Sequence, residues 1–167
     1  NYRIRLTDPS MIRLDYPVEA GGKFWPCSYI ELGNPGLPHA VIPYPGLAEK
    51  TMDELRTLGR SLRWNPAFPK GANVNFYDVT GPDQVTELTF ERGVEDFTYA
   101  CGTGTGSTVL ALTMKGLVSG EDVTVSVPGG ALRVTIDRDG SSVQSIWLTG
   151  PTNVVCVGEV RDEELAL

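Results

Sequence analysis

Cys101 is the residue of this sequence best placed for chemistry, because it opens the glycine-rich run 101–107. The segment that follows, 108–117, carries apolar residues on nearly every side of a helix, a pattern typical of buried helices. A thiolate at the start of such a helix is stabilised by the helix dipole. We therefore predict that the pKa of Cys101 is lowered, that its thiol is reactive, and that the run forms the reactive half of an active site.

Three further polar features could contribute to the same site. The backbone N–H groups from Gly102 to Gly106 can hold a carboxylate or a phosphate. Asn73 and Asn75 share one face of a predicted strand, where asparagine is disfavoured, so they indicate either polar groups that face a ligand or a turn at Asn73. His39 is the only histidine, at a loop-to-strand junction. By itself such a residue is more often on the surface, or hydrogen-bonded within the fold, than catalytic.

The composition is typical of one globular domain. The chain has 167 residues, of which 41% are hydrophobic and 21% charged, so it is long enough to bury a core. Its net charge of −7 excludes a general nucleic-acid or anionic-membrane binder, which needs a basic patch. No stretch approaches the roughly 18 apolar residues of a membrane span, and we expect no signal peptide. We therefore expect no nucleic-acid and no membrane partner.

The three cysteines do not indicate a disulfide framework or a metal site. Cys27, Cys101 and Cys156 are far apart and odd in number, so we expect free thiols, no metal and a reducing compartment, the cytoplasm. Cys27 lies in a predicted strand and is expected to fill the core. The chain begins with Asn1 rather than methionine, and Ile4 already belongs to an alternating pattern, so we expect a piece of a longer protein.

Two helices and about eight strands are predicted. The first helix spans 51–64, where Thr51 and Glu54 form a capping box and a leucine stripe provides one apolar face. The second helix follows Cys101. After an extended segment 1–16 and before an acidic tail, strands are predicted within 24–32, 40–42, 68–79, 84–90, 123–127, 131–136, 143–149 and 153–159. The expected fold class is α+β, with a curled, mostly antiparallel sheet wrapped around the second helix.

Six short motifs follow one another along nearly the whole chain. They are Pro38-His39, Phe68-Pro69, Asn73-Val74-Asn75-Phe76, Glu91-Arg92-Gly93, Ala100-Cys101-Gly102-Thr103-Gly104 and Leu148-Thr149-Gly150-Pro151. In this order they resemble the C-terminal half of the diaminopimelate epimerase family. The Cys-Gly-Thr-Gly signature preceded by Glu-Arg-Gly is the most specific part of the resemblance.

The resemblance implies a cofactor-independent amino-acid epimerase built from two similar domains with a cleft between them. Each domain contributes one cysteine: one thiolate removes the α-proton of the substrate, and the opposite thiol protonates the other face. In this family the reaction converts LL- to meso-diaminopimelate, a precursor of lysine and peptidoglycan. The residues agree with half of this scheme, because removing a weakly acidic α-proton needs a desolvated base and donors for the charge that accumulates. We expect an amino-acid substrate and an N-terminal partner domain, without which this chain is inactive.

The resemblance also assigns roles to individual residues. The implied catalytic residues are Cys101, His39 and Glu91, and the implied substrate-binding residues are Asn73, Glu91, Arg92, Gly102 and Thr103. The thiol would transfer the proton, while His39 and Glu91 would orient and polarise the site. Arg92 suits a distal carboxylate, because its guanidinium can bind one with two hydrogen bonds. The N–H groups of Gly102 and Thr103 would hold the α-carboxylate.

The sequence departs from the family pattern at three points. Phe97 stands where members usually have a glutamate, and Leu37 stands where many have an asparagine, so the exact substrate stays open. Neither Cys27 nor Cys156 lies in a glycine turn like that of Cys101. The second catalytic cysteine is therefore expected in the absent N-terminal domain.

Other functions stay open at this point. Proline and hydroxyproline racemases and the isomerases of phenazine synthesis share the two-domain architecture, although Arg92 favours a dicarboxylic substrate and a reactive Cys101 disfavours the phenazine branch. A non-catalytic domain that binds a carboxylated ligand is the third alternative, and half a cleft would bind such a ligand weakly. The exposed cleft wall could also pair with a second copy, so a homodimer is a further expectation.

Overall fold

The computed structural model describes residues 1–159, which form twelve strands and three helices. The strands are β1 (Tyr2–Arg5), β2 (Pro9–Arg13), β3 (Val18–Ala20), β4 (Lys23–Trp25), β5 (Ser28–Leu32), β6 (Leu37–Pro43), β7 (Asn73–Gly81), β8 (Gln84–Glu91), β9 (Asp96–Thr98), β10 (Val123–Val127), β11 (Gly130–Asp139) and β12 (Ser142–Gly150). The helices are α1 (Met52–Arg63), α2 (Gly102–Met114) and a short 3-10 helix, η1 (Leu47–Glu49). Within this part of the chain, no helix is long and apolar enough to cross a membrane.

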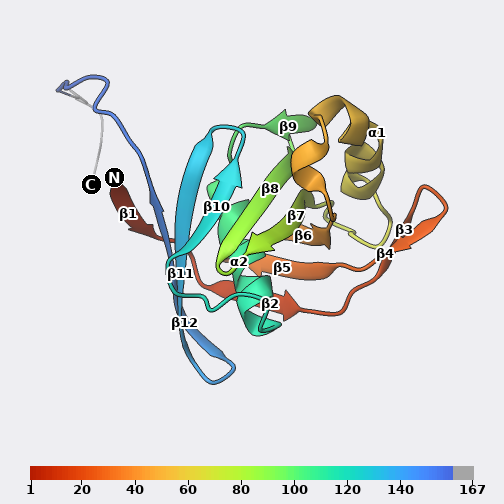
Figure 1. Cartoon of the computed structure of the whole chain (residues 1–167), viewed down its shortest axis with the longest axis horizontal. Helices are drawn as coiled ribbons and strands as arrows, with labels where there is room; N and C mark the ends of the chain where they lie inside the picture. The colour runs from red at the N-terminus through yellow and green to blue at the C-terminus, as the bar shows by residue number, and fades with distance from the viewer. Residues whose placement is uncertain (160–167) are drawn as a thin grey trace, which may run out of the picture.

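One sheet curls around α2, while α1 lies outside it (Figure 1). The strand order is β1-β12-β11-β10-β8-β7-β6-β5-β2, with β9 paired to β8, and β3 and β4 form a separate hairpin. The β6–β7 and β8–β10 pairs are parallel and the other pairs of the sheet are antiparallel. The predicted fold class, an α+β fold with a curled and mostly antiparallel sheet around a central helix, is confirmed.

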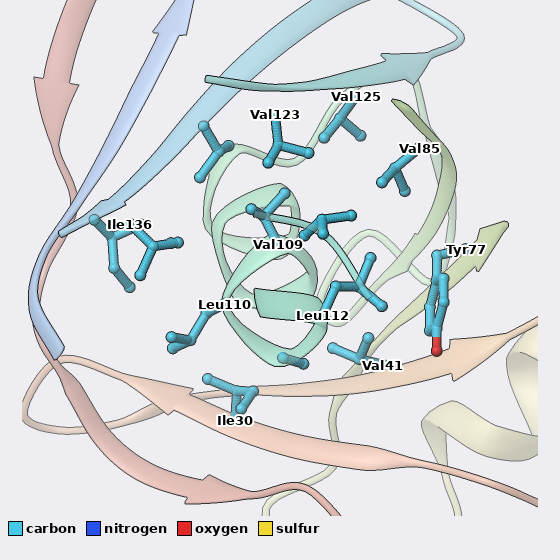
Figure 2. Close-up of a cluster of buried hydrophobic side chains, with 14 of the residues drawn as sticks. Ile30, Val41, Tyr77, Val85, Val109, Leu110, Leu112, Val123, Val125 and Ile136 are labelled. Atoms are coloured by element: carbon cyan, nitrogen blue, oxygen red, sulfur yellow. The ribbon is translucent and has the colours of Figure 1, made fainter. Parts of the chain in front are cut away.

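The apolar part of α2 forms the inner core. Figure 2 shows Val109, Leu110 and Leu112 of α2 between side chains of the strands that surround them. The labelled partners from the sheet are Ile30, Val41, Tyr77, Val85, Val123, Val125 and Ile136. A Cβ at Gly106 would lie 2.4 Å from Leu6 Cδ1, so the glycine lets the helix sit tightly inside the curl. The structure also shows that the glycine-rich run 101–107, predicted as a turn before the helix, forms the first part of α2, which begins at Gly102.

A second core lies between α1 and the outer face of the sheet. Leu55 and Leu62 of α1 are buried there with Phe76 of β7 and Phe90 of β8. This arrangement confirms the predicted leucine stripe of a surface helix. Cys27 belongs to the same core and is 2% exposed, so its predicted role as core filler is also confirmed.

Two predicted strands differ from the structure. The segment 24–32 is divided at Pro26 into β4, which pairs with β3, and β5, which pairs with β2 and β6. The strand predicted at 153–159 is wrong, since these residues form no regular structure and are exposed. The physical reason is that the chain leaving β12 cannot pair back onto it, because β12 is already paired on both sides, with β11 and with β1. Most of the predicted acidic tail, 160–167, lies outside the described residues.

Thr51→Ala should lower the free energy of unfolding by about 1 kcal/mol, because it removes one side of the capping box. Thr51 Oγ1 accepts a hydrogen bond from the N–H of Glu54, and the Glu54 carboxylate accepts one from the N–H of Thr51. Urea unfolding measures the change. Thr57→Ala, at an exposed position inside the same helix, is the control and should be neutral or slightly stabilising. Equal effects of the two substitutions would contradict the capping role.

Candidate active site

The inner face of the sheet turns polar where it meets the start of α2. His39 on β6, Asn75 on β7 and Thr89 on β8 are buried there, and each alternates along its strand with residues that face outward. Asn75 lies opposite Thr89 across the β7–β8 pair. A Cβ at Gly104 would lie 2.6 Å from Asn75 Oδ1, so the glycine allows the helix to approach this polar group closely. The helix start and the polar side chains therefore form one site.

Cys101 is the N-terminal cap residue of α2 and has an extended backbone, with φ −131° and ψ 101°. Its carbonyl accepts a hydrogen bond from the N–H of Thr105 at 2.8 Å, so the N–H groups of Gly102 and Thr103 precede the helical ladder. Its Sγ lies 3.7 Å from Thr103 Oγ1, and 9% of the residue is exposed. The structure thus places the thiol and the leading N–H groups together, as the sequence predicts.

The predicted lowering of the Cys101 pKa is wrong for this chain. Burial of the sulfur raises the pKa to about 11, and the carboxylates of Glu91 and Glu87 act in the same direction. The N–H of Gly104 and the hydroxyl of Thr103 stabilise the thiolate, but they do not offset the loss of water around the sulfur. At neutral pH Cys101 is therefore a thiol, the form that donates a proton.

His39 is fully buried inside β6, not at a surface junction. The amide Nδ2 of Asn75 lies 3.2 Å from its Nδ1, and Asn75 Oδ1 in turn accepts a hydrogen bond from Thr89 Oγ1 at 3.1 Å. Because an amide nitrogen only donates, Nδ1 is the acceptor and the ring proton lies on Nε2. Nε2 has no hydrogen-bond partner within the described residues. Burial lowers the pKa of His39 to about 3, so the ring is a neutral donor.

The side chain of Asn73, the first residue of β7, binds the backbone of Arg92, which directly follows β8. Asn73 Nδ2 donates to the carbonyl of Pro38 at 3.1 Å, and Asn73 Oδ1 accepts from the backbone N–H of Arg92 at 2.8 Å. The guanidinium of Arg92 donates through Nη1 to the carbonyl of Lys70 at 2.9 Å. Asn73 therefore links the backbone at Pro38 to the backbone at Arg92. The Arg92 guanidinium has further N–H groups besides the one bonded to Lys70.

Glu91 is the charged group that acts on the thiol from the end of β8. Its Oε1 accepts a hydrogen bond from Thr98 Oγ1 at 2.6 Å, which fixes the carboxylate on β8 beside β9. Its negative charge raises the pKa of Cys101, so the two groups are electrostatically coupled. Glu91 itself is half-buried.

Phe97 and Leu37, the two single-residue departures from the family pattern, lie on different faces of the sheet. Phe97 packs against Phe90 in the outer core, with ring centroids 5.3 Å apart in an edge-to-face arrangement. It therefore does not point its ring at the thiol. Leu37 lies two residues before His39 on β6, on the same face of the strand, and is half-buried. Of the two, Leu37 is the one positioned to affect the site.

Sequence reasoning missed Glu87 as part of the site, and it gave Asn75 no individual role beyond that of a polar group on the same strand face as Asn73. Asn75 is the residue that hydrogen-bonds the histidine. Glu87 is buried against α2, with its carboxylate bonded to the hydroxyls of Thr105 and Thr108. The alternation of residues along the two strands could have indicated them. Polar residues recur at every second position, on the faces that would otherwise pack against an apolar helix. Their hydrogen bonds depend on strand register and helix position, which local patterns do not provide.

Two solved structures share this fold of a sheet curled around a helix. One is a probable proline racemase from Agrobacterium radiobacter K84 with bound carbonate, at a TM-score of 0.61 and 17% identity, covering 87% of this chain and 49% of that chain. The other is a hydroxyproline epimerase from Agrobacterium vitis with bound trans-4-OH-L-proline, at a TM-score of 0.55 and 19% identity. The match covers 87% of this chain and 48% of that chain. The fold is therefore proline-racemase-like.

Sequence comparison defines the family within this class. The model of the diaminopimelate epimerase family matches residues 32–155. The diaminopimelate epimerase of Chlorobaculum tepidum is 37% identical over 160 residues, which are 95% of this chain and 57% of the relative. That of Methanothrix thermoacetophila is 35% identical over 167 residues, 98% of this chain and 56% of the relative. The chain belongs to the diaminopimelate epimerase family, and it spans about half the length of the curated relatives it matches.

We predict that the single histidine stays neutral at physiological pH. With a pKa of about 3 in the folded chain and 6.5 as the ordinary value, the unfolded chain binds more protons between these two values. Above pH 6.5 the titration of His39 therefore does not change the free energy of unfolding. As the pH falls from 6.5 toward 3, the free energy of unfolding decreases by about 1.4 kcal/mol per pH unit. His39→Gln should remove this part of the pH dependence of urea unfolding. An NMR titration midpoint of the ring protons near 6.5 would contradict the prediction.

Glu91→Gln should lower the pKa of Cys101, because the carboxylate disfavours the thiolate. The measurement is the pH dependence of Cys101 alkylation, followed by mass spectrometry of its peptide. A Cys156→Ser background removes the exposed thiol. Glu95→Gln is the control, since the Glu95 carboxylate is paired with Arg63. If both variants show the wild-type pH dependence, Glu91 does not act on the thiol.

Proposed function

We propose that this chain supplies one thiol-bearing half of a diaminopimelate epimerase, which inverts an amino-acid α-carbon by proton transfer between two cysteines. The observation that carries the proposal is the Cys101 thiol at the start of α2, beside the leading N–H groups of Gly102 and Thr103, which have no hydrogen-bond partner among residues 1–159. Membership of the family and the half-length match to its relatives support it. The second thiol then belongs to the other half of the enzyme.

In this proposal the N–H groups of Gly102 and Thr103 hold the α-carboxylate of the substrate. A carboxylate bound there draws electron density from the α-carbon, so the carbanion that forms when the α-proton leaves is stabilised where its charge accumulates. The Cys101 thiol then protonates the α-carbon from its own face. In the reverse direction the Cys101 thiolate removes the proton. The glycines at the helix start allow the substrate to approach the backbone closely.

The thiolate formed in one direction needs a positive charge that this half-site does not supply. Burial and Glu91 hold the pKa of Cys101 at about 11, too high for a thiolate at neutral pH. The α-ammonium group of an amino acid carries such a charge next to the reacting carbon. We infer that substrate binding beside Glu91 lowers the pKa of the thiol by placing this cation near it.

The remaining residues bind and orient the substrate in the proposal. His39 offers a neutral Nε2–H donor, which polarises a carboxylate without exchanging protons. Arg92, held by the carbonyl of Lys70, directs its remaining guanidinium donors to a distal carboxylate. Asn73 fixes the backbone of Arg92 and thereby the position of that donor. A substrate with carboxylates at both ends fits this set of donors.

The test is incorporation of solvent deuterium at the α-carbon of LL-diaminopimelate by the full-length protein. Cys101→Ala should reduce the rate by about 10²–10⁴-fold, because it removes the proton-transferring group. Cys156→Ala, at an exposed cysteine without a role in the site, should leave the rate unchanged. The 167-residue chain alone should be inactive and bind the substrate weakly in calorimetry.

Three results would contradict the proposal. Undiminished exchange in Cys101→Ala would exclude the thiol as the proton carrier. Turnover of proline or trans-4-hydroxyproline but not of diaminopimelate would replace the substrate. Tight binding of diaminopimelate by the monomeric chain would show that the site is not half of a cleft, whereas tight binding only by a dimer would assign the second half to another copy.

A further inference from the structure

Glu87 is a buried carboxyl group that the proposed proton transfer does not use. It lies on β8 with none of its surface exposed, and it forms no ion pair within residues 1–159. Instead its oxygens accept hydrogen bonds from the hydroxyls of Thr105 and Thr108, each at 2.6 Å. Burying a carboxyl group without a cation costs stability, so a structural or functional gain must compensate.

Thr105 connects this carboxyl group to the backbone of Cys101. Thr105 donates its backbone N–H to the carbonyl of Cys101 at 2.8 Å, while its hydroxyl binds Glu87. One residue thus joins the carboxyl group on β8 to the backbone of the catalytic candidate. Thr108 lies three residues further along, a spacing that puts both hydroxyls on one face of the helix.

The start of α2 has little intrinsic stability. The side chain of Cys101 makes no capping hydrogen bond, and no acidic residue lies in the first turn. Each glycine in the run 102–106 disfavours a helix by about 1 kcal/mol relative to alanine. Contacts with the sheet must therefore hold this segment in place, and Glu87 provides two hydrogen bonds for that purpose.

We propose that Glu87 is a positioning residue, which anchors the start of α2 to β8 through two threonine hydroxyls and thereby fixes the Cys101 thiol and the N–H groups beside it. The inference rests on the proposed function of Cys101. Glu87 does not touch the substrate in this role. It acts through Thr105, whose amide sets the position of the Cys101 carbonyl at the first hydrogen bond of the helix.

The Glu87 carboxyl group also affects the pKa of the Cys101 thiol through its negative charge. The titratable groups that face it are Cys101 on α2, Tyr77 opposite it on β7, and Glu91 on the same face of β8. The residues that β10 presents toward the core near Glu87 are the apolar Val125 and Val127. Burial raises the pKa of Glu87 to about 7, and its negative charge contributes to the raised pKa of Cys101. The hydrogen bonds and the charge of Glu87 can therefore be tested separately.

Glu87→Gln and Glu87→Ala separate these two effects. Glutamine keeps polar contacts to both threonines without the charge, whereas alanine removes contacts and charge. In a Cys156→Ser background, we expect alanine to speed hydrogen–deuterium exchange of the amides at 105–108 by about tenfold or more. Glutamine should restore wild-type protection and raise the rate of Cys101 alkylation at about pH 8 severalfold, because a nearby negative charge is gone.

The matched control is Glu31→Gln. Glu31 is also nearly buried, at 5% exposure, and is bonded to Tyr29 and Lys70, but it lies on the outer face of the sheet. This variant should change neither exchange at 105–108 nor Cys101 alkylation. The double variant Thr105→Val and Thr108→Val removes the same contacts from the helix side at nearly constant volume, and it replaces Glu87→Ala if that variant does not fold.

The proposal is overturned if Glu87→Ala, or the threonine double variant, leaves both exchange and alkylation at wild-type values. It is also overturned if glutamine loses protection to the same extent as alanine, because the hydrogen bonds would then not be the anchor. Neither readout requires a substrate. Failure of the Glu87 proposal is therefore distinguishable from failure of the epimerase proposal, which deuterium incorporation at the substrate tests.

Discussion

The burial of the start of α2 inside the sheet is the constraint on which the rest of this structure depends. A helix that begins inside a sheet brings polar backbone groups, and the hydroxyls of its first turns, against the neighbouring strands. Those strands carry the polar side chains His39, Asn75, Glu87 and Thr89 on a face that is apolar elsewhere. The division of the inner face into polar and apolar parts follows from where the helix begins.

The same burial decides which protonation states the site can hold. A helix start favours an anion by about 0.3–1 kcal/mol, and up to about 2 in partly buried geometry. At Cys101 this is less than the cost of removing water from the sulfur, so the pKa rises to about 11. At His39 burial disfavours the imidazolium, so the ring stays neutral. Two of the three groups that the resemblance names as catalytic, Cys101 and His39, are therefore uncharged at rest.

Local patterns in the sequence predicted the elements that local interactions determine. The helix at 51–64 follows from its capping box and leucine stripe, and the central helix follows from its apolar residues. The absence of a strand at 153–159 was not predictable in the same way, because a strand also needs a partner, and β12, the strand before it, is already paired with β11 and β1. The pKa of Cys101 and the contact of Asn75 with His39 depend on burial and strand pairing. Motif order located the site, but only the three-dimensional register showed which side chains share it.

The groups left unsatisfied in the site define the chemistry of its ligand. Nε2–H of His39 and the leading N–H groups of the helix are donors, and donors enclosed in a protein call for an acceptor such as a carboxylate. Glu91 and a thiol that must become a thiolate call for a cation. A simple anion would satisfy only the first demand, and a simple amine only the second. In the proposed function an α-amino acid meets both demands, because its carboxylate and its ammonium group are bonded to the one carbon whose proton would be transferred.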